Sequence, residues 1–332
     1  MLPCARSRSI TAFPRLGITN SRCLYRPLLI NQSIRTLSTS TSTEGYQLNI
    51  DGEASKRLNL QHDLFKRIFG GKFLPDKIVQ NLKLIQQNGE KQLKIADVAT
   101  GTGIWLFSIK DELAKSGLNA ELHGYDLFDE QFPPVDKRAG IIFDTLNILD
   151  TEKFKAIGEE YHYIHARLLT VVLTVDEWKV AIENCLQVLK PGGYIHFEEI
   201  PINDMAIEKS GVPETGGLLK KLQASMTLLK RDLDCGNNIH KIYEVNKLED
   251  ITHDKIDLRD CDDEAKRMQN VNARMGFEEF VTNAIARGPQ ALNRLGFESK
   301  EAALAKLDQL QLGVSTRIQA YFVLHSIIGK KP

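Results

Sequence analysis

The sequence predicts an α/β protein: a doubly wound, mostly parallel β-sheet covered by helices, with a further helical segment forming a lid. Three observations lead to this prediction. Short apolar segments that end in polar residues alternate with stretches of helical length, which is typical of βαβ units. A glycine-rich turn follows the first of these segments, at residues 97–103. With 332 residues, 42% of them hydrophobic, the chain can bury one large core with an appended subdomain.

Residues 1–43 differ in composition from the rest of the chain. They hold six arginines, seven serines and six threonines, but no lysine, aspartate or glutamate. This composition is typical of a mitochondrial transit peptide, and Arg35-Thr36-Leu37-Ser38 resembles a matrix-peptidase cleavage site. We therefore favour import into the mitochondrial matrix over the alternative, a disordered basic tail on a cytoplasmic protein. From Glu44 onward, 37 basic and 43 acidic residues leave a net charge of about −6, which is ordinary for an enzyme surface.

Residues 44–90 predict an N-terminal helical cap. Apolar residues recur at steps of three and four from Leu58 to Phe69, and Gly70-Gly71 ends the first helix. A second helix is expected over residues 75–87.

Residues 91–203 predict the core of the sheet, because strand-length and helix-length segments alternate there. Helices are expected over 104–115 and 176–189, and Pro191-Gly192-Gly193 ends the second. Right-handed crossovers through these helices imply parallel strands. The expected strands are 93–99, 121–126, 140–144, 161–166 and 194–200.

Residues 204–312 predict a helical lid or substrate region that includes one late strand, at 251–258. The segment 313–332 carries a final apolar strand, 318–328, that completes the sheet. A helical region at this position can cover the carboxyl edge of the strands, where open α/β sheets bind ligands. No run of 18 apolar residues predicts a membrane span, and the spacing of the cysteines predicts neither a metal site nor a disulfide framework.

The strongest motif is Asp97-Val98-Ala99-Thr100-Gly101-Thr102-Gly103, between the first strand and the first core helix. Gly101 and Gly103 permit a tight turn and a close approach of the backbone to a ligand, and the helix start offers free N–H groups. Asp126 ends the second strand, 23 residues after Gly103, where a carboxylate can accept both hydroxyls of a ribose. The pattern predicts a nucleotide cofactor.

The loop favours S-adenosylmethionine (SAM) over a nicotinamide dinucleotide. A dinucleotide loop has a third glycine, but here Gly103 is followed by the bulky pair Ile104-Trp105. Asp97 before the loop suits a cofactor that carries cations, and SAM has an amine and a sulfonium. An oxidoreductase is the weaker alternative.

In these motifs the sequence resembles class I SAM-dependent methyltransferases, within them the fungal group of gliotoxin-type methyltransferases and the LaeA-like regulators of secondary metabolism. The resemblance implies a seven-stranded Rossmann-like methyltransferase sheet, SAM as cofactor and methyltransferase activity (EC 2.1.1.-). The motifs are Arg57-Leu58-Asn59-Leu60-Gln61-His62, Asp97 to Trp105, Gly124-Tyr125-Asp126, Phe143-Asp144, His165-Ala166-Arg167-Leu168-Leu169, Lys190 to Tyr194, Glu198-Glu199 and Gly329-Lys330-Lys331-Pro332.

The resemblance also implies a set of cofactor-binding residues. The loop around Asp97 would surround the methionine moiety, Asp126 would hold the ribose, and Asp144 would lie at the adenine edge. Ala99 stands where the wider superfamily has a glycine, and we expect it at negative φ. The full set is Gln61, His62, Asp97, Ala99, Gly101, Gly103, Trp105, Asp126, Leu127, Asp144, Thr145, His165 and Arg167.

Four members of this set have ordinary structural alternatives. His165 can be an ordinary residue at a strand end. His62 can be a solvent-facing or core histidine of its helix, and Trp105 can pack in the core rather than on adenine. Arg167 can hold a carboxylate of the substrate or cofactor, or pair with a neighbouring acid.

Candidate general bases lie at the ends of the fourth and fifth strands: His165, Glu198 and Glu199. Glu198 and Glu199 should point to opposite faces of the sheet, so at most one faces the cofactor. The fourth strand lacks the Asp/Asn-Pro-Pro-Tyr/Phe motif that serves amino groups of bases, so we expect a small-molecule acceptor and no nucleic acid. The alternative function is a regulatory or scaffolding protein that keeps the fold and acts through protein partners.

Overall fold

The computed structural model describes residues 52–209, 211–213, 217–309 and 318–332. The chain divides into two units, Met1–Ser42 and Thr43–Pro332, and all the described residues belong to the second. The predicted transit peptide therefore lies outside the described residues.

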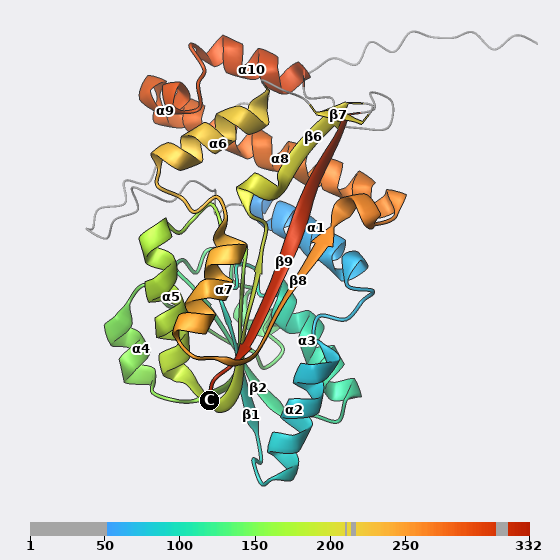
Figure 1. Ribbon diagram of the computed structural model, residues 1–332, viewed down its shortest axis with the longest axis vertical. Helices are drawn as coiled ribbons and strands as arrows, with labels where there is room; N and C mark the ends of the chain where they lie inside the picture. The colour runs from blue at the N-terminus through green and yellow to red at the C-terminus, as the bar shows by residue number, and fades with distance from the viewer. Residues whose placement is uncertain (1–51, 210, 214–216, 310–317) are drawn as a thin grey trace, which may run out of the picture. The chain divides into compact units, whose positions relative to one another are not determined.

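The described residues form one nine-stranded sheet, in the order β3-β2-β1-β4-β5-β9-β6-β7, with β8 also paired to β9 (Figure 1). Strands β1 to β5 run parallel, and β9 is antiparallel to β5, β6 and β8. The predicted α/β class and doubly wound topology are confirmed. The strands that the sequence predicted are observed as β1 (Leu93–Val98), β2 (Ala120–Asp126), β3 (Ile142–Thr145), β4 (Tyr161–Arg167), β5 (Leu189–Glu199), β8 (Glu249–Asp257) and β9 (Ile318–Lys330).

Two strands were not predicted, β6 (Met205–Lys209) and β7 (Val212–Pro213). They replace the helix that the sequence suggested from Asp204 onward. The cause is the length of β9: residues 325–330 pair with β5 on one side, while residues 318–322 extend beyond β5 and pair with β6. β8 pairs with residues 323–330 of β9, on the side away from β5.

Helices cover both faces of the sheet (Figure 1). On one face lie α1 (Gly52–Ile68), α2 (Asp76–Gln87) and α3 (Ile104–Lys115), whose apolar residues form one core with β1, β4 and β9. On the other lie α4 (Thr151–Ile157), α5 (Val175–Val188) and α7 (Cys235–Val245), which form a second core. The predicted helix 104–115 agrees with α3 to the residue.

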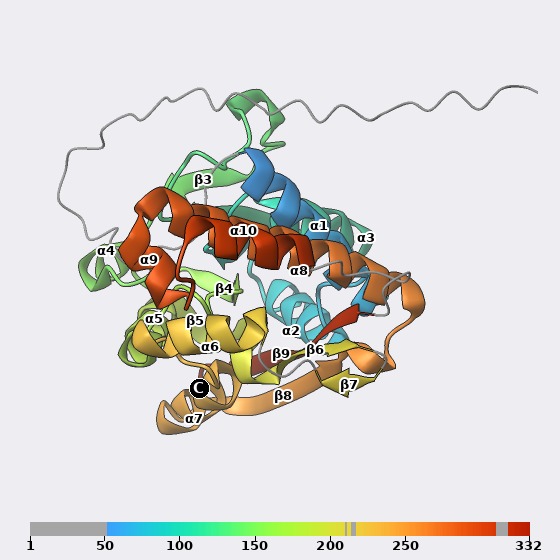
Figure 2. The ribbon, with the colours of Figure 1, turned by 90° about the horizontal axis from the view of Figure 1, so that it is seen from above.

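Four helices form a separate layer beyond the carboxyl edge of the sheet (Figure 2): α6 (Leu218–Leu228), α8 (Asp263–Arg287), α9 (Pro289–Arg294) and α10 (Lys300–Gln309). They have a small core of their own, which includes Leu222, Met226, Phe277 and Val281. The predicted lid, residues 204–312, was too wide. It included α7 and β8, but α7 buries Cys235, Ile239 and Tyr243 at four-residue steps against the sheet. Short 3-10 turns lie at Val135–Lys137, Ile202–Asp204 and Leu258–Asp260.

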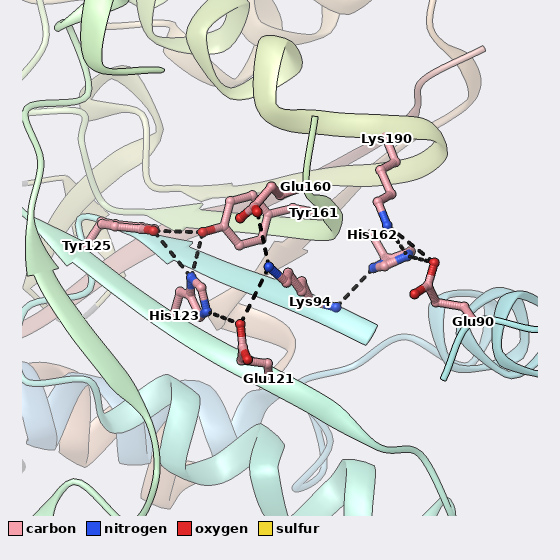
Figure 3. A network of polar contacts seen from close by, with 9 residues as sticks. All are labelled: Glu90, Lys94, Glu121, His123, Tyr125, Glu160, Tyr161, His162 and Lys190. Atoms are coloured by element: carbon pink, nitrogen blue, oxygen red, sulfur yellow. Dashed lines mark hydrogen bonds and ion pairs between the residues drawn. The ribbon is translucent and has the colours of Figure 1, made fainter. Parts of the chain in front are cut away.

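A polar network joins β1, β2 and β4 near the amino ends of β1 and β4 (Figure 3). Lys94 Nζ lies 3.1 Å from Glu160 and 3.7 Å from Glu121, and the Tyr161 hydroxyl lies 2.6 Å from Nδ1 of His123. Because open α/β sheets bind ligands at the opposite edge, we interpret this network as structural. Where the structure describes the chain, no helix has the length and apolar character needed to cross a membrane.

Candidate functional site

The glycine turn lies between β1 and α3, as the motif predicts. Gly101 has φ +55° and Gly103 has φ +73°, both in the left-handed region that favours glycine. A Cβ on Gly103 would lie 2.5 Å from the ring of Phe143, so no side chain fits there. No side chain caps α3 at Gly103, so the first amides of the helix are available to a ligand.

Two residues near this site have a strained backbone: Ala99 within the turn and Leu168 after β4. The conformation of Ala99 contradicts the prediction. Ala99 has φ +61°, not the expected negative value, and Leu168 after β4 also has φ +61°. A left-handed conformation costs a residue with a Cβ roughly 1–2 kcal/mol. Both residues follow the carboxyl ends of neighbouring strands, β1 and β4. Strain of this kind is typical of functional sites.

Asp126 and Asp144 stand at the carboxyl ends of β2 and β3. Asp126 Oδ2 accepts a hydrogen bond from the Gly101 N–H at 2.7 Å, which ties the carboxylate to the glycine turn. Burial raises the pKa of Asp126 to about 6, although the Gly101 N–H opposes the shift. Leu127, Asp144 and Thr145 are exposed, and Asp126 is level with Thr145 across the β2–β3 pair. These four residues line an edge that a nucleoside can reach.

Asp97, His165 and Glu198 form a buried chain across β1, β4 and β5. His165 Nδ1–H donates to Asp97 Oδ1 at 2.7 Å, and His165 Nε2 lies 3.4 Å from Glu198 Oε2. The other Asp97 oxygen accepts the Thr100 hydroxyl at 2.6 Å, at the start of the glycine turn. Trp105 is fully buried and stacks on the His165 ring, with centroids 3.9 Å apart. Trp105 therefore packs in the core, its structural alternative, and does not reach an adenine at the exposed edge.

The charges of Asp97, His165 and Glu198 compensate one another. Burial alone would lower the pKa of His165, but the hydrogen bond to Asp97 and the nearby Glu198 carboxylate outweigh it and raise the pKa. Burial would likewise raise the pKa of Glu198, yet His165, His196 and Arg167 lower it to about 2. The two carboxylates thus favour the protonated form of His165. These three side chains are suited to holding β1, β4 and β5 in position.

Arg167 lies beside His62 rather than beside an acid. Arg167 Nη2–H donates to His62 Nδ1 at 3.1 Å, and His62 Nε2 lies 2.8 Å from the Ser108 hydroxyl. Burial and the Arg167 charge lower the pKa of His62 to about 3, so this histidine is neutral and carries its proton on Nε2. Arg167 Nη1 is buried and has no hydrogen-bond partner among the described residues. That donor suits an anionic group of a ligand, such as a carboxylate.

Glu198 and Glu199 point to opposite faces of the sheet, as expected. Glu199 accepts the N–H groups of Leu169 and Thr170 and the Thr170 hydroxyl, at 2.6–3.0 Å. Burial raises the pKa of Glu199 to about 7 despite these donors. Glu199 therefore holds the loop after β4.

The three candidate bases do not reach the open edge. His165, Glu198 and Glu199 are each at most 1% exposed, and all three are engaged with protein groups. The sequence motifs place them near strand ends correctly, but the depth of His165 and Glu198 depends on α1 and α3, which cover their face, whereas Glu199 is buried on the other face. The structure thus places the predicted catalytic residues in supporting positions.

A cavity that the sequence did not predict opens between the sheet edge and the lid. It contains about 1000 Å³ of space not filled by atoms, its open mouth included. Gln61 and Leu168 line it from the side of the cofactor motifs, and Phe277 and Gly276 line it from α8. No local motif could indicate Gly276 and Phe277, because they lie more than 100 residues from Leu168 and more than 200 residues from Gln61 along the chain.

The described residues fit SAM. The glycine turn leaves room for a close ligand, Asp126 offers a carboxylate at the edge, and Arg167 has an unsatisfied donor. Gln61 lies in the cavity wall next to this set, whereas His62 is buried behind it.

The chain is similar in sequence to fungal methyltransferases. No protein-family model matches it. Methyltransferase grgD of a Penicillium species is 29% identical over 182 residues, 53% of this chain and 60% of its own length. N-methyltransferase tcpN of Claviceps purpurea is 32% identical over 145 residues, 43% of this chain and 47% of its own. The chain thus spans about half the length of these two relatives.

Two further relatives extend the similarity. Methyltransferase pytC of Aspergillus terreus is 23% identical over 301 residues, 86% of this chain and 83% of its own. The secondary metabolism regulator LAE1 of Hypocrea atroviridis is 26% identical over 155 residues, 47% of this chain and 40% of its own. These matches confirm the resemblance to the gliotoxin-type and LaeA-like group. The solved structure of Haemonchus contortus phosphoethanolamine N-methyltransferase 2 with S-adenosyl-L-methionine is 15% identical, with a TM-score of 0.40 over 83% of this chain and 57% of that one.

Proposed function

We propose that this protein is a SAM-dependent methyltransferase that acts on a small molecule. The observation that carries the proposal is the hydrogen bond between Asp126 and the Gly101 N–H, which joins the ribose-type carboxylate to the glycine turn. The similarity to fungal methyltransferases supports the same activity.

Each group of residues has a separate task in cofactor binding. Asp126 would accept the ribose hydroxyls, Asp144 would meet the adenine edge, and Arg167 Nη1 would donate to the methionine carboxylate. When bound, the sulfonium of SAM supplies an activated methyl group. The chain's part is to orient the acceptor in the cavity and to exclude water, because in-line methyl transfer depends mainly on position.

Isothermal calorimetry of the full chain with S-adenosylhomocysteine tests the proposal. We expect binding of micromolar strength, about −8 kcal/mol. Asp126→Ala should weaken it at least 100-fold, because the ribose hydroxyls lose their acceptor. Asp129→Ala, which removes an exposed carboxylate three residues away, is the matched control and should bind normally.

Absence of binding to the wild-type chain would reject the enzyme and favour the regulatory alternative, which the similarity to LAE1 supports. In that case the decisive experiment is a search for a stoichiometric protein partner, whose binding should survive Asp126→Ala.

We further propose that the enzyme works in the mitochondrial matrix, on the composition of residues 1–43. A fluorescent protein fused to these residues should enter mitochondria, and the same fusion with all six arginines replaced by glutamine should stay in the cytosol. Cytosolic fluorescence of the unaltered fusion would reject import by this segment.

A further inference from the structure

We infer from the cavity under the lid that the methyl acceptor is an uncharged, largely apolar molecule that carries at least one N–H or O–H group. This inference rests on the proposed function, because it assigns the cavity to the acceptor of that reaction. It is carried by the position of the cavity, the chemistry of its wall and one buried polar atom without a hydrogen-bond partner in a side chain of that wall.

The position of the cavity suits an acceptor. Leu168 and Thr170, which line it, follow β4 directly after Arg167, and Leu58 lies 3.3 Å from a Cβ placed on Gly101. The cavity therefore begins beside the glycine turn and extends under the lid, toward Phe277 on α8.

The wall is mostly apolar and holds no uncompensated charge among the described residues. Most lining side chains are aliphatic or aromatic, from α1, β6, α6, α8 and β9. The ionisable ones are Arg57 and Tyr321. Arg57 Nε–H donates to Glu279 Oε2 at 2.7 Å, and both residues are buried. A charged acceptor would lose its hydration here without gaining a partner, which is costly.

Besides Gln61 and Thr170, the wall holds a polar amide pair on α8. Asn272 Nδ2–H donates to Gln269 Oε1 at 3.5 Å, while Asn272 Oδ1 is buried and has no hydrogen-bond partner among the described residues. A buried carbonyl oxygen without a donor costs free energy until a donor reaches it. An acceptor with an N–H or O–H group supplies that donor.

Two fluorescent probes with the same skeleton test the charge preference. N-phenyl-1-naphthylamine is neutral and has one N–H, whereas 1-anilinonaphthalene-8-sulfonate adds a sulfonate. With the full chain saturated with S-adenosylhomocysteine, we expect the neutral probe to bind at least tenfold more tightly than the sulfonate. Equal binding, or tighter binding of the sulfonate, would overturn the inference.

Variants at Gly276 test the place of binding. A Cβ on Gly276 meets nothing within 4 Å, so a side chain there enters open space on the cavity wall. Gly276→Phe should abolish binding of the neutral probe and leave S-adenosylhomocysteine binding intact, whereas Gly276→Ala should retain both. Undiminished probe binding to Gly276→Phe would place the probe elsewhere and contradict the inference.

Asn272→Leu tests the hydrogen bond. The neutral probe should lose the advantage that it has over its N-methylated derivative, which lacks the N–H, and the ratio of the two affinities should fall to about one. An unchanged ratio would exclude Asn272 as the partner. Absence of S-adenosylhomocysteine binding to the wild-type chain would instead reject the proposed function. Failure of the inference about the acceptor can therefore be distinguished from failure of the proposed function.

Discussion

At the residue scale, Asp126 has a carboxylate whose ionisation should control cofactor affinity. Its pKa is raised to about 6 because burial disfavours the charged form. Only the carboxylate can accept both ribose hydroxyls, so affinity should be full above pH 7 and fall as the pH drops through 6. We expect the dissociation constant of S-adenosylhomocysteine to rise roughly tenfold between pH 7.5 and 5, measured by calorimetry.

Asp126→Asn provides the control for this pH dependence. An amide cannot ionise, so the variant should bind more weakly at pH 7.5 but show little change down to pH 5. If the variant kept the wild-type pH dependence, another group would be responsible.

His165 offers a second prediction at this scale, on stability. His165→Leu leaves the buried Asp97 and Glu198 carboxylates without their shared partner, which should cost about 3–5 kcal/mol at pH 7.5. The pKa of His165 is raised, so its share of this stabilisation is full below the unfolded value of 6.5 and is lost as the pH rises through its folded pKa. The pKa of Glu198 is lowered to about 2, so its share is lost only as the pH falls below the unfolded value of 4.5. Urea denaturation should therefore show a difference at pH 5 that is at least as large as at pH 7.5.

Tyr163→Phe is the matched comparison, because it removes one buried hydrogen bond, to His196 at 2.7 Å, and no charge. It should cost about 1 kcal/mol at both pH values. A His165→Leu effect of that size, equal at both pH values, would show that the chain Asp97–His165–Glu198 carries no net ionic stabilisation.

Residue types and spacing predicted which side chains would stand at strand ends, but not how deep they would lie. Asp126 and Asp144 lie at the carboxyl ends of β2 and β3, where the edge is open; Asp126 is half-buried and Asp144 is exposed. His165 and Glu198 lie near the ends of β4 and β5 in the middle of the sheet, where α1 and α3 cover them. Depth depends on this tertiary packing, which has no local signal.

At the scale of elements, α8 carries a glycine at an unfavourable position. Gly276 lies in the middle of a 25-residue helix, where glycine costs about 0.5–1 kcal/mol relative to alanine. Because a Cβ there meets nothing within 4 Å, Gly276→Ala should raise the free energy of unfolding by roughly that amount, measured by urea denaturation. Unchanged or lower stability would indicate that the glycine is needed for helix geometry.

The elements also show where the sequence pattern is sufficient. Residues 104–115 have a clear start after Gly103 and a clear apolar face, and α3 agrees with the prediction. α7 has an equally apolar face, but the pattern cannot say whether that face meets the sheet or the lid. The hairpin β6–β7 depends on the free edge of β9, more than 100 residues later in the chain.

At the scale of the whole molecule, the order of the strands makes the last segment of the chain central. β9 lies between β5 and β8 and also pairs with β6, so it joins the parallel sheet to the segment that leads into the lid. Phe322, Leu324 and Ile328 enter the core on one face, and Ile327 enters the core on the other. The sequence could predict a final strand, but not that three other strands depend on it.

Truncations at the two ends should therefore have opposite effects. Deletion of residues 318–332 exposes the edge of β5, leaves β6 and β8 without their partner and removes apolar groups from both cores. We expect no cooperative thermal unfolding and no binding of S-adenosylhomocysteine. Deletion of residues 1–43 removes a segment without acidic residues that composition assigns to import, and the melting temperature should not change. A cooperative transition in the variant that lacks residues 318–332 would mean that β1 to β5 with their helices fold alone. In that case β9 would stabilise the lid rather than the sheet.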